Sequence, residues 1–254
     1  MITKTKVALV TGGSRGLGRD MAIQLARGGT DILLTYHTNR EKAEEVIQAI
    51  EAIGQKAHAI QLDTSRPDSF DPYFAQVTGY LQKEYGDPHF DFLINNAGTG
   101  LYVPFAQVTE EQFDAMLNIH FKGVFFLTQK ALPLMRDGGR IVNISSGLAR
   151  FSMIGSATYA SMKGAVEVLT RYLAKELGPR RITANIVAPG AIETDFGGGR
   201  VRDNKEINAF VSGVTALGRV GLPEDIGGVV AFLCSEEARW INAQRIEVSG
   251  GMHI

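Results

Sequence analysis

The feature that most constrains the fold is a regular alternation of short β-branched runs with longer stretches of helical periodicity. Strands are predicted at residues 6–11, 31–36, 57–63, 90–95, 140–145, 182–188 and 245–248. Helices are expected between them, at residues 17–27, 40–53, 109–135, 157–177 and 224–234, and a loop-rich interruption at residues 188–221. This order is typical of a single α/β domain, residues 1–254, with a doubly wound parallel sheet and helices on both of its faces.

Composition limits the kinds of partner that the chain is expected to have. The 254 residues carry 26 basic and 27 acidic side chains, a net charge of −1, so no surface for nucleic acid or an anionic membrane is predicted. No apolar run approaches the roughly 20 residues that span a bilayer. The single cysteine, Cys234, permits neither an internal disulfide nor a cysteine-rich metal site. We therefore expect a cytoplasmic protein with small-molecule partners and no metal.

A glycine-rich loop follows the first predicted strand. The stretch TGGSRGLG, residues 11–18, places Gly12, Gly16 and Gly18 where the strand meets the first helix. Glycines there permit a tight turn and a close approach of the backbone to a pyrophosphate, whose charge meets the N–H groups of the helix N-terminus. Such glycines alone also fit a plain turn, but their position after the first strand favours a dinucleotide site.

The second predicted strand indicates which dinucleotide binds. An acidic side chain after this strand usually binds the ribose of NAD, whereas basic groups accept the 2′-phosphate of NADP. The stretch LLTYHTNR, residues 33–40, contains no acid, and Arg15, His37, Asn39 and Arg40 supply donors. Arg40 fits a solvated surface equally well, and Arg15 inside the loop is the stronger candidate. NADP is therefore predicted, and NAD is the less favoured cofactor.

Several motifs stand in an order that resembles a known family. They are TGGSRGLG at 11–18, LD at 62–63, NNAG at 95–98, Asn118, Ser146, YASMK at 159–163 and PGAIET at 189–194. Together they resemble the short-chain dehydrogenase/reductase family over essentially the whole chain. The resemblance implies a single-domain Rossmann fold with a seven-stranded sheet, a nicotinamide cofactor, hydride transfer, and assembly into homotetramers or dimers.

The resemblance also implies roles for four polar residues. Tyr159 would be the general acid and base, Lys163 its partner one helical turn away, Ser146 a second hydroxyl on the substrate carbonyl, and Asn118 a water anchor. Carbonyl reduction leaves negative charge on oxygen, so a proton must come from a group poised near neutral pH. Lys163 and the positive ring of the oxidised cofactor are expected to lower the pKa of Tyr159. His120 is expected to be structural and to face away from Asn118.

The cofactor site is expected to combine the loop with residues at several strand ends. Its members are Gly12, Ser14, Arg15, Gly16, Leu17, Gly18, His37, Asn39, Asp63, Asn95, Ala97, Gly98, Tyr159, Lys163, Pro189, Gly190, Ile192 and Thr194. Asp63 and Asn95 fit helix caps or turn formers as an alternative. Ser145 is the rival of Ser146, but strand alternation sends the two side chains to opposite sides.

Substrate choice is expected to depend on mostly apolar loops and on residues 191–213, which form a substrate-binding segment with three glycines suited to a mobile lid. Arg150, Arg200 and Arg202 keep a carboxylate-binding pocket open as a possibility. The terminal stretch VSGGMHI has Ser249 where many relatives carry aspartate. This position is expected to affect only packing or assembly, because it is remote from the chemistry in sequence order.

Both long predicted helices carry apolar residues on nearly every side, so a homo-oligomer built through them is expected. Three functions remain open. The first is an NADPH-dependent reductase of ketones or aldehydes, favoured over an enoyl reductase by the three-residue gap between Tyr159 and Lys163. The second is a 3-oxoacyl-[acyl-carrier-protein] reductase, for which Arg136, Arg180 and Arg181 would supply a basic surface. The third is a non-catalytic NADP-binding sensor.

Overall fold

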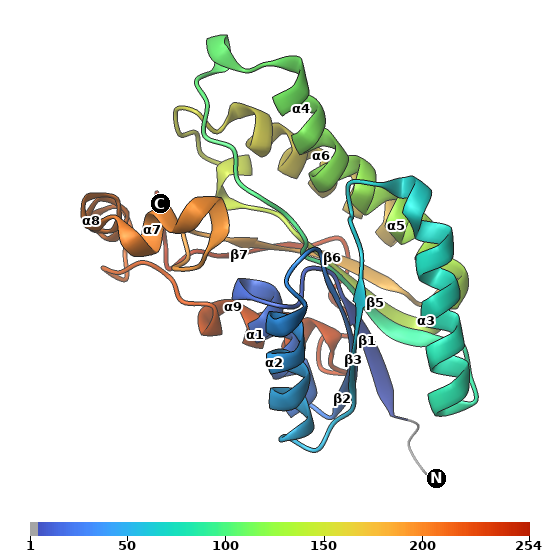
Figure 1. Cartoon of the computed structure of the whole chain (residues 1–254). Coiled ribbons are helices and arrows are strands. Elements are labelled where there is room, and N and C mark those ends of the chain that lie inside the picture. The colour runs from blue at the N-terminus through green and yellow to red at the C-terminus, as the bar shows by residue number, and fades with distance from the viewer. Residues whose placement is uncertain (1–4) are drawn as a thin grey trace.

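The computed structural model describes residues 5–254, and its centre is a sheet of parallel strands (Figure 1). The strand order is β3-β2-β1-β4-β5-β6-β7. The strands are β1 Lys6–Val10, β2 Thr30–Tyr36, β3 Ala57–Gln61, β4 Phe90–Asn95, β5 Met135–Ile144, β6 Thr183–Pro189 and β7 Arg245–Val248. Because β1 lies between β2 and β4, the winding of the chain reverses there, and the carboxyl ends of these strands form the natural crevice for a ligand.

Helices follow most of the strands. They are α1 Gly16–Arg27, α2 Arg40–Glu51, α3 Phe70–Tyr85, α4 Glu110–Leu117, α5 Gly123–Ala131, α6 Ala157–Glu176, α7 Arg200–Asp203, α8 Lys205–Gly213 and α9 Glu224–Cys234. A π-helical turn, Asn118–Lys122, joins α4 to α5. Within residues 5–254, no helix is both long and apolar enough to cross a membrane.

The helices cover both faces of the sheet, as the sequence predicts (Figure 1). Strand alternation shows this division in β1, because Ala8 and Val10 pack into one apolar cluster and Val7 and Leu9 into the other. The first cluster contains residues of α1, α2 and α9, and the second contains residues of α3, α5 and α6. The α/β fold with a doubly wound seven-stranded sheet is therefore confirmed.

The helix predicted at residues 109–135 is wrong in two respects. The π turn beginning at Asn118 inserts an extra residue, and the close approach of Gly123 to the Thr64 carbonyl leaves no space for a Cβ there. The helix also ends at Ala131, and β5 begins at Met135 rather than at residue 140. The early start of β5 is possible because a register shift against β4 lets Met135 pair with Phe90.

Two other regions contain more helix than the sequence predicts. The sequence set no bounds for α3, and α7 and α8 lie inside the interruption expected at residues 188–221. The start of α8 has a physical reason, because the Asn204 side chain accepts hydrogen bonds from the N–H groups of Glu206 and Ile207. This cap overrides the loop-like composition of the segment.

Candidate active site

A cavity of about 770 Å³ lies at the carboxyl ends of the central strands. Its wall contains most of the residues that the sequence predicts for the site: Gly12, Ser14, Arg15, Gly16, Leu17, Gly18, His37, Asp63, Ala97, Gly98, Ser146, Tyr159, Lys163, Pro189, Gly190, Ile192 and Thr194. Asn39, Asn95 and Asn118 do not belong to the wall. The structure thus brings together groups from loops that are far apart in the sequence.

The glycine loop has the geometry that a pyrophosphate requires. Gly12 and Gly16 have φ angles of +65° and +53°, which glycine adopts without strain. A Cβ at Gly18 would overlap the Gly12 carbonyl oxygen, so helix α1 can approach the loop only because position 18 is glycine. No acidic residue lies in the first turn of α1, which leaves its N-terminal N–H groups suited to an anion. These residues therefore fit the phosphates of a dinucleotide.

Asn96 fastens this loop to the end of β4, a role that the sequence did not reveal. Its Nδ2 donates to the carbonyl oxygens of Thr11 (2.9 Å) and Gly12 (3.2 Å). The Thr11 hydroxyl accepts in return from the N–H groups of Asn96 (2.9 Å) and Ala97 (3.0 Å). The NNAG motif was the available signal, although it did not indicate which asparagine contacts the loop.

Two of the four predicted phosphate donors line the cavity. Arg15 and His37 do so, whereas the Asn39 side chain caps α2 by accepting from the Lys42 N–H at 2.9 Å. Arg40 forms an ion pair with Glu44 along the same helix. The basic character expected beside the adenosine ribose therefore rests on Arg15 and His37.

Asp63 stands next to His37 at the end of the β3 segment. The two side chains are 3.7 Å apart, and the Asp63 carboxylate accepts from the N–H (2.9 Å) and hydroxyl (2.7 Å) of Ser65. Burial raises the pKa of Asp63, but the Ser65 hydrogen bonds and the charge of His37 outweigh it, so the pKa is lowered overall. Asp63 is therefore an anionic acceptor on the adenosine side of the cavity.

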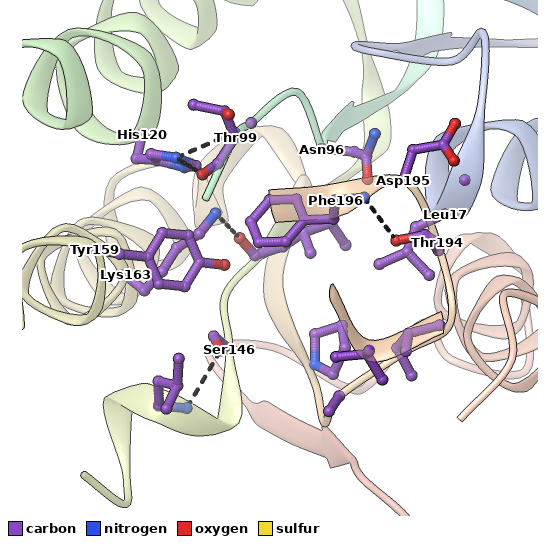
Figure 2. A pocket seen from close by; sticks show the side chains of 18 of the residues that line it. Leu17, Asn96, Thr99, His120, Ser146, Tyr159, Lys163, Thr194, Asp195 and Phe196 are labelled. Atoms are coloured by element: carbon purple, nitrogen blue, oxygen red, sulfur yellow. Dashed lines mark hydrogen bonds between the residues drawn. The ribbon is translucent and has the colours of Figure 1, made fainter. Parts of the chain in front are cut away.

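Tyr159, Lys163 and Ser146 meet at the other end of the cavity (Figure 2). Tyr159 and Lys163 are only 9% and 5% exposed, which is unusual for a lysine. The Lys163 ammonium donates to the Ile144 carbonyl oxygen at 2.7 Å and lies 5.6 Å from the centre of the Tyr159 ring. Ser145 is directed elsewhere, since its hydroxyl donates to Glu167 at 2.7 Å. The choice of Ser146 over Ser145 therefore agrees with the geometry.

The expected lowering of the Tyr159 pKa is not produced by the protein groups alone. Burial raises the pKa of Tyr159 most strongly, the nearby Tyr102 raises it further, and a hydrogen bond with Ser146 opposes them. Burial also lowers the pKa of Lys163 to about 8. Desolvation disfavours both charged forms, which explains why the lysine does not offset the effect on the phenol.

Asn95 and Asn118 do not occupy the positions that the sequence predicts. The Asn95 amide is buried and donates to Thr128 (2.9 Å) and Asn143 (2.7 Å), so it links β4 to β5 and α5. Asn118 begins the π turn, where its carbonyl oxygen accepts from the Gly123 N–H. Neither side chain reaches the cavity wall.

His120, for which the sequence predicts a structural role, lies in the cavity wall. Its ring centre is 5.0 Å from that of Tyr159, with the rings at 89° to each other (Figure 2). Residues two apart on a helix project in nearly opposite directions. Since the Asn118 side chain points away from the cavity, that of His120 points into it. A regular helical period gives no sign of the π turn that sets this orientation.

The substrate side of the cavity is lined by aromatic and aliphatic side chains. Its members include Tyr102, Phe151, Met153, Ile154, Phe196, Phe210 and Met252. Met252, from the chain end, is a wall residue that the sequence did not predict. Sequence order could not show this contact, because β7 is an edge strand that runs beside β6 and delivers the chain end to the site.

The three arginines considered for a carboxylate pocket differ in their contacts. Arg150 pairs with Glu247 and donates to the carbonyl oxygens of the last residues, including Met252 at 2.8 Å. Arg202 pairs with two aspartates, Asp195 and Asp203. Arg200 lines the cavity with its guanidinium 4.5 Å above the Tyr102 ring and has no carboxylate partner within residues 5–254.

Comparison with known proteins agrees with this geometry. A family model described as "Enoyl-(Acyl carrier protein) reductase" matches residues 12–253. Hydroxynaphthalene reductase-like protein Arp2 of Metarhizium brunneum is 37% identical, with 97% of this chain and 94% of that protein covered. Tetrahydroxynaphthalene reductase PfmaG of Pestalotiopsis fici is also 37% identical, with coverage of 97% and 91%.

A solved structure extends the similarity to three dimensions. The angucycline C-6 ketoreductase LanV with bound NADP has a TM-score of 0.94 and 39% identity, covering 98% of this chain and 96% of its own. The glycine loop, the buried tyrosine and lysine, and the matched length all point to one conclusion. The chain belongs to the short-chain dehydrogenase/reductase family.

Proposed function

We propose that this chain is an NADPH-dependent carbonyl reductase whose substrates are ketones on fused aromatic ring systems. The observation that carries the proposal is the convergence of Tyr159, Lys163 and Ser146 on the cavity that also holds the glycine loop. The names of the similar proteins support the substrate class, since they describe reductases of hydroxynaphthalenes and of an angucycline. The apolar and aromatic lining of the substrate side fits planar rings.

Each residue of the proposed machinery has a task. NADPH held in this cavity would supply the hydride for the carbonyl carbon. Tyr159 gives its phenolic proton to the carbonyl oxygen as negative charge develops there, and the Ser146 hydroxyl donates a hydrogen bond to the same oxygen. Lys163 donates one of its three N–H groups to the Ile144 carbonyl oxygen, so two remain for the cofactor ribose and a further acceptor, while its charge stabilises the phenolate.

The preference for NADPH rests on the charges around the adenosine end. Arg15 and His37 line that part of the cavity with mostly exposed side chains, and the structure of LanV contains NADP. A 2′-phosphate would meet these basic groups, whereas NADH carries no phosphate at that position for them to bind. We assign the remaining contacts of the predicted cofactor site to the same dinucleotide.

The role of Asn118 in catalysis remains a prediction, and its position suggests an indirect effect. It would act through the π turn rather than through its side chain, because its amide does not reach the cavity wall. Replacing Asn118 with alanine should then leave NADPH binding unchanged and have a small effect on turnover.

The segment of residues 191–213 is our candidate for the substrate-binding lid. Gly197, Gly198 and Gly199 all have positive φ angles, between +59° and +77°, so this stretch uses a backbone that other residues rarely adopt. Phe196 and Phe210 project from it into the cavity wall. Hydrogen exchange should slow in residues 195–213 when NADPH and substrate are added, and an unchanged rate would contradict the lid.

Acyl-carrier-protein reduction is the less favoured function. Arg136 pairs with Asp87 and Asp91, and Arg180 pairs with Asp137 and donates to the Leu132 carbonyl. Both arginines thus have partners within the chain. They lie near the start of β5, at the end of the strands opposite the cavity. An acidic carrier protein docked there would not deliver its thioester to Tyr159.

We also propose a homotetramer or dimer formed through α4, α5 and α6. Several large apolar side chains on these helices are exposed: Phe113 (43%), Phe125 (38%), Phe126 (38%), Val168 (46%) and Tyr172 (64%). Large exposed apolar side chains on neighbouring helices are typical of an interface. Sedimentation of the wild type should show a concentration-dependent oligomer, and Tyr172→Glu should shift it to smaller species. A cytoplasmic location stays a prediction from the sequence.

The decisive experiment combines one variant with a substrate panel. Tyr159→Phe removes the proton donor while keeping the ring, so turnover should fall by about 10²–10⁴-fold, with NADPH binding retained in a fluorescence titration. Bicyclic and tricyclic aromatic ketones should be reduced faster than β-ketoacyl thioesters, and with a higher kcat/KM for NADPH than for NADH. Unchanged activity of Tyr159→Phe would refute catalysis by this residue, and lost activity with unchanged binding would exclude the sensor.

A further inference from the structure

His120 is an ionisable side chain of the cavity wall to which the proposed reaction assigns no task. It is fully buried, with 0% exposure, and it projects from the π turn into the cavity wall. Its Nε2 lies 2.7 Å from the Thr99 carbonyl oxygen and 3.3 Å from the Thr99 backbone nitrogen. We assign the hydrogen to Nε2, because the shorter contact is to an oxygen that can only accept. Figure 2 shows the ring beside Thr99 and above Tyr159 and Lys163 in this view.

The position of this imidazole depends on the glycine beside it, Gly98. A Cβ at Gly98 would lie 2.6 Å from Cε1 and 3.1 Å from Nδ1 of His120, so a larger residue at position 98 would displace the ring. The missing side chain at Gly98 therefore has a second reason besides the approach of a cofactor. The conformation of the loop after β4 and the identity of residue 120 depend on each other.

The other ring nitrogen, Nδ1, has no hydrogen-bond partner among residues 5–254. With the hydrogen on Nε2, Nδ1 presents a lone pair inside a buried site, which is costly unless a donor meets it. A phenylalanine would fill the same space without that cost. Packing alone therefore does not explain why a histidine stands here.

The groups around His120 are those of the proposed proton transfer. Tyr159 and Lys163 face it from α6, and Tyr102 approaches Tyr159 from the loop after β4. Burial lowers the pKa of His120 most strongly and the charge of Lys163 lowers it further, against the hydrogen bond with Thr99, to about 3. The imidazole is therefore neutral at physiological pH and able to accept a hydrogen bond.

We propose that His120 is a positioning residue, whose imidazole holds the Tyr159 ring edge-on and offers Nδ1 as a hydrogen-bond acceptor to the Lys163 ammonium, directly or through one water. The inference rests on the proposed function, because it assigns the proton transfer to Tyr159. A neutral acceptor beside Lys163 stabilises the ammonium, and the ammonium in turn stabilises the Tyr159 phenolate. His120 thus acts on the reaction through its two neighbours.

Three substitutions of His120 distinguish the contributions of its ring, of its hydrogen-bond donor Nε2 and of its acceptor Nδ1. His120→Phe keeps a ring and removes both nitrogens, and we expect kcat to fall by about 10²-fold. His120→Asn places an amide oxygen near the position of Nδ1, and it should recover about tenfold of that loss. His120→Gln reaches toward the position of Nε2 and restores the bond to Thr99 without the acceptor, so it should remain close to His120→Phe.

The pH profile provides a readout that a structural role would not move. For oxidation of the corresponding alcohol, kcat rises with pH as the phenolate forms, and this rise should move to higher pH in His120→Phe and return toward the wild type in His120→Asn. KM for the substrate and the Kd for NADPH should change much less than kcat. His58→Phe is the control, since His58 also contacts a tyrosine ring, that of Tyr80, but lies outside the cavity wall.

The outcomes distinguish this inference from the proposed function. Wild-type kcat and pH profile in His120→Phe, or better rescue by glutamine than by asparagine, would overturn the acceptor role while Tyr159→Phe stays inactive. A larger loss in Asn118→Ala than in His120→Phe would also overturn it, in favour of position 118. If Tyr159→Phe retains wild-type turnover, the proposed function itself fails.

Discussion

The two ends of the cavity are built by different means. At the cofactor end the fit depends on the backbone, through the glycine loop, the N-terminus of α1 and the Asn96 bonds to Thr11 and Gly12. At the substrate end it depends on side chains such as Tyr102, Phe196 and Met252, which come from loops, the 191–213 segment and the chain end. A site made of backbone groups suits the pyrophosphate, which is the same in every dinucleotide cofactor. A surface made of side chains can instead vary with the substrate.

Gly18→Ala should produce the largest effect among tests of this comparison. The added methyl would overlap the Gly12 carbonyl oxygen, and relieving such an overlap costs about 1–3 kcal/mol. The Kd for NADPH should rise by about 10–100-fold, equally for every carbonyl substrate, when measured by fluorescence titration. Gly79→Ala is the control, because a Cβ at Gly79 on helix α3 meets nothing within 4 Å. A loss of activity toward only one carbonyl substrate would contradict the assignment of the glycine loop to the cofactor end.

Arg15→Ala should produce the next largest effect. Its guanidinium is an exposed group of the cofactor end, with the Asp195 carboxylate 3.9 Å away. Loss of a hydrogen bond to a phosphate costs about 1.5 kcal/mol, so the Kd for NADPH should rise about tenfold while that for NADH stays constant. Isothermal titration with both cofactors checks this. An equal change for NADPH and NADH would remove Arg15 from recognition of the 2′-phosphate.

Phe196→Ala tests the substrate end and should have a smaller effect. The ring is 40% exposed and lies 5.8 Å from that of Tyr159, centre to centre, so its removal deletes only part of a contact. KM should rise about fivefold for the larger aromatic ketones and less for a small aliphatic ketone, with the Kd for NADPH unchanged. A uniform rise across the panel would show that the ring acts on Tyr159 rather than on the substrate.

Glu247→Gln should have the smallest effect, and it depends on pH. Arg150 in particular, with Arg245 and Ser249, lowers the pKa of Glu247 to about 2 from an ordinary value of 4.5 despite partial burial. Since the folded pKa is depressed, the stabilisation is complete above pH 4.5 and is lost as the pH falls toward 2. The variant should lower Tm by about 2–4 °C at pH 7, and the difference should shrink below pH 4.5. A constant difference would exclude the carboxylate charge as its cause.

Local patterns in the sequence were sufficient for most of the fold. The strands at 90–95 and 245–248 and the helix at 224–234 were predicted with the bounds that the structure has. Their signals lie within a few residues, in the β-branched runs and in Pro223 before α9. The prediction of one helix at 109–135 failed because this segment contains a π turn, next to which Gly123 packs closely against the Thr64 carbonyl of another segment, a contact that local patterns do not reveal.

The sequence by itself determined the doubly wound sheet, the glycine loop, and the presence of a tyrosine and a lysine one turn apart, because each is a matter of local period or spacing. Only the tertiary structure decided that His120 and not Asn118 faces Tyr159, that Asn39 and Asn95 are used in capping and packing, and that Met252 closes the substrate end. These orientations arise from contacts between segments distant in the chain, where one inserted residue in a helix turns the next side chains to another face.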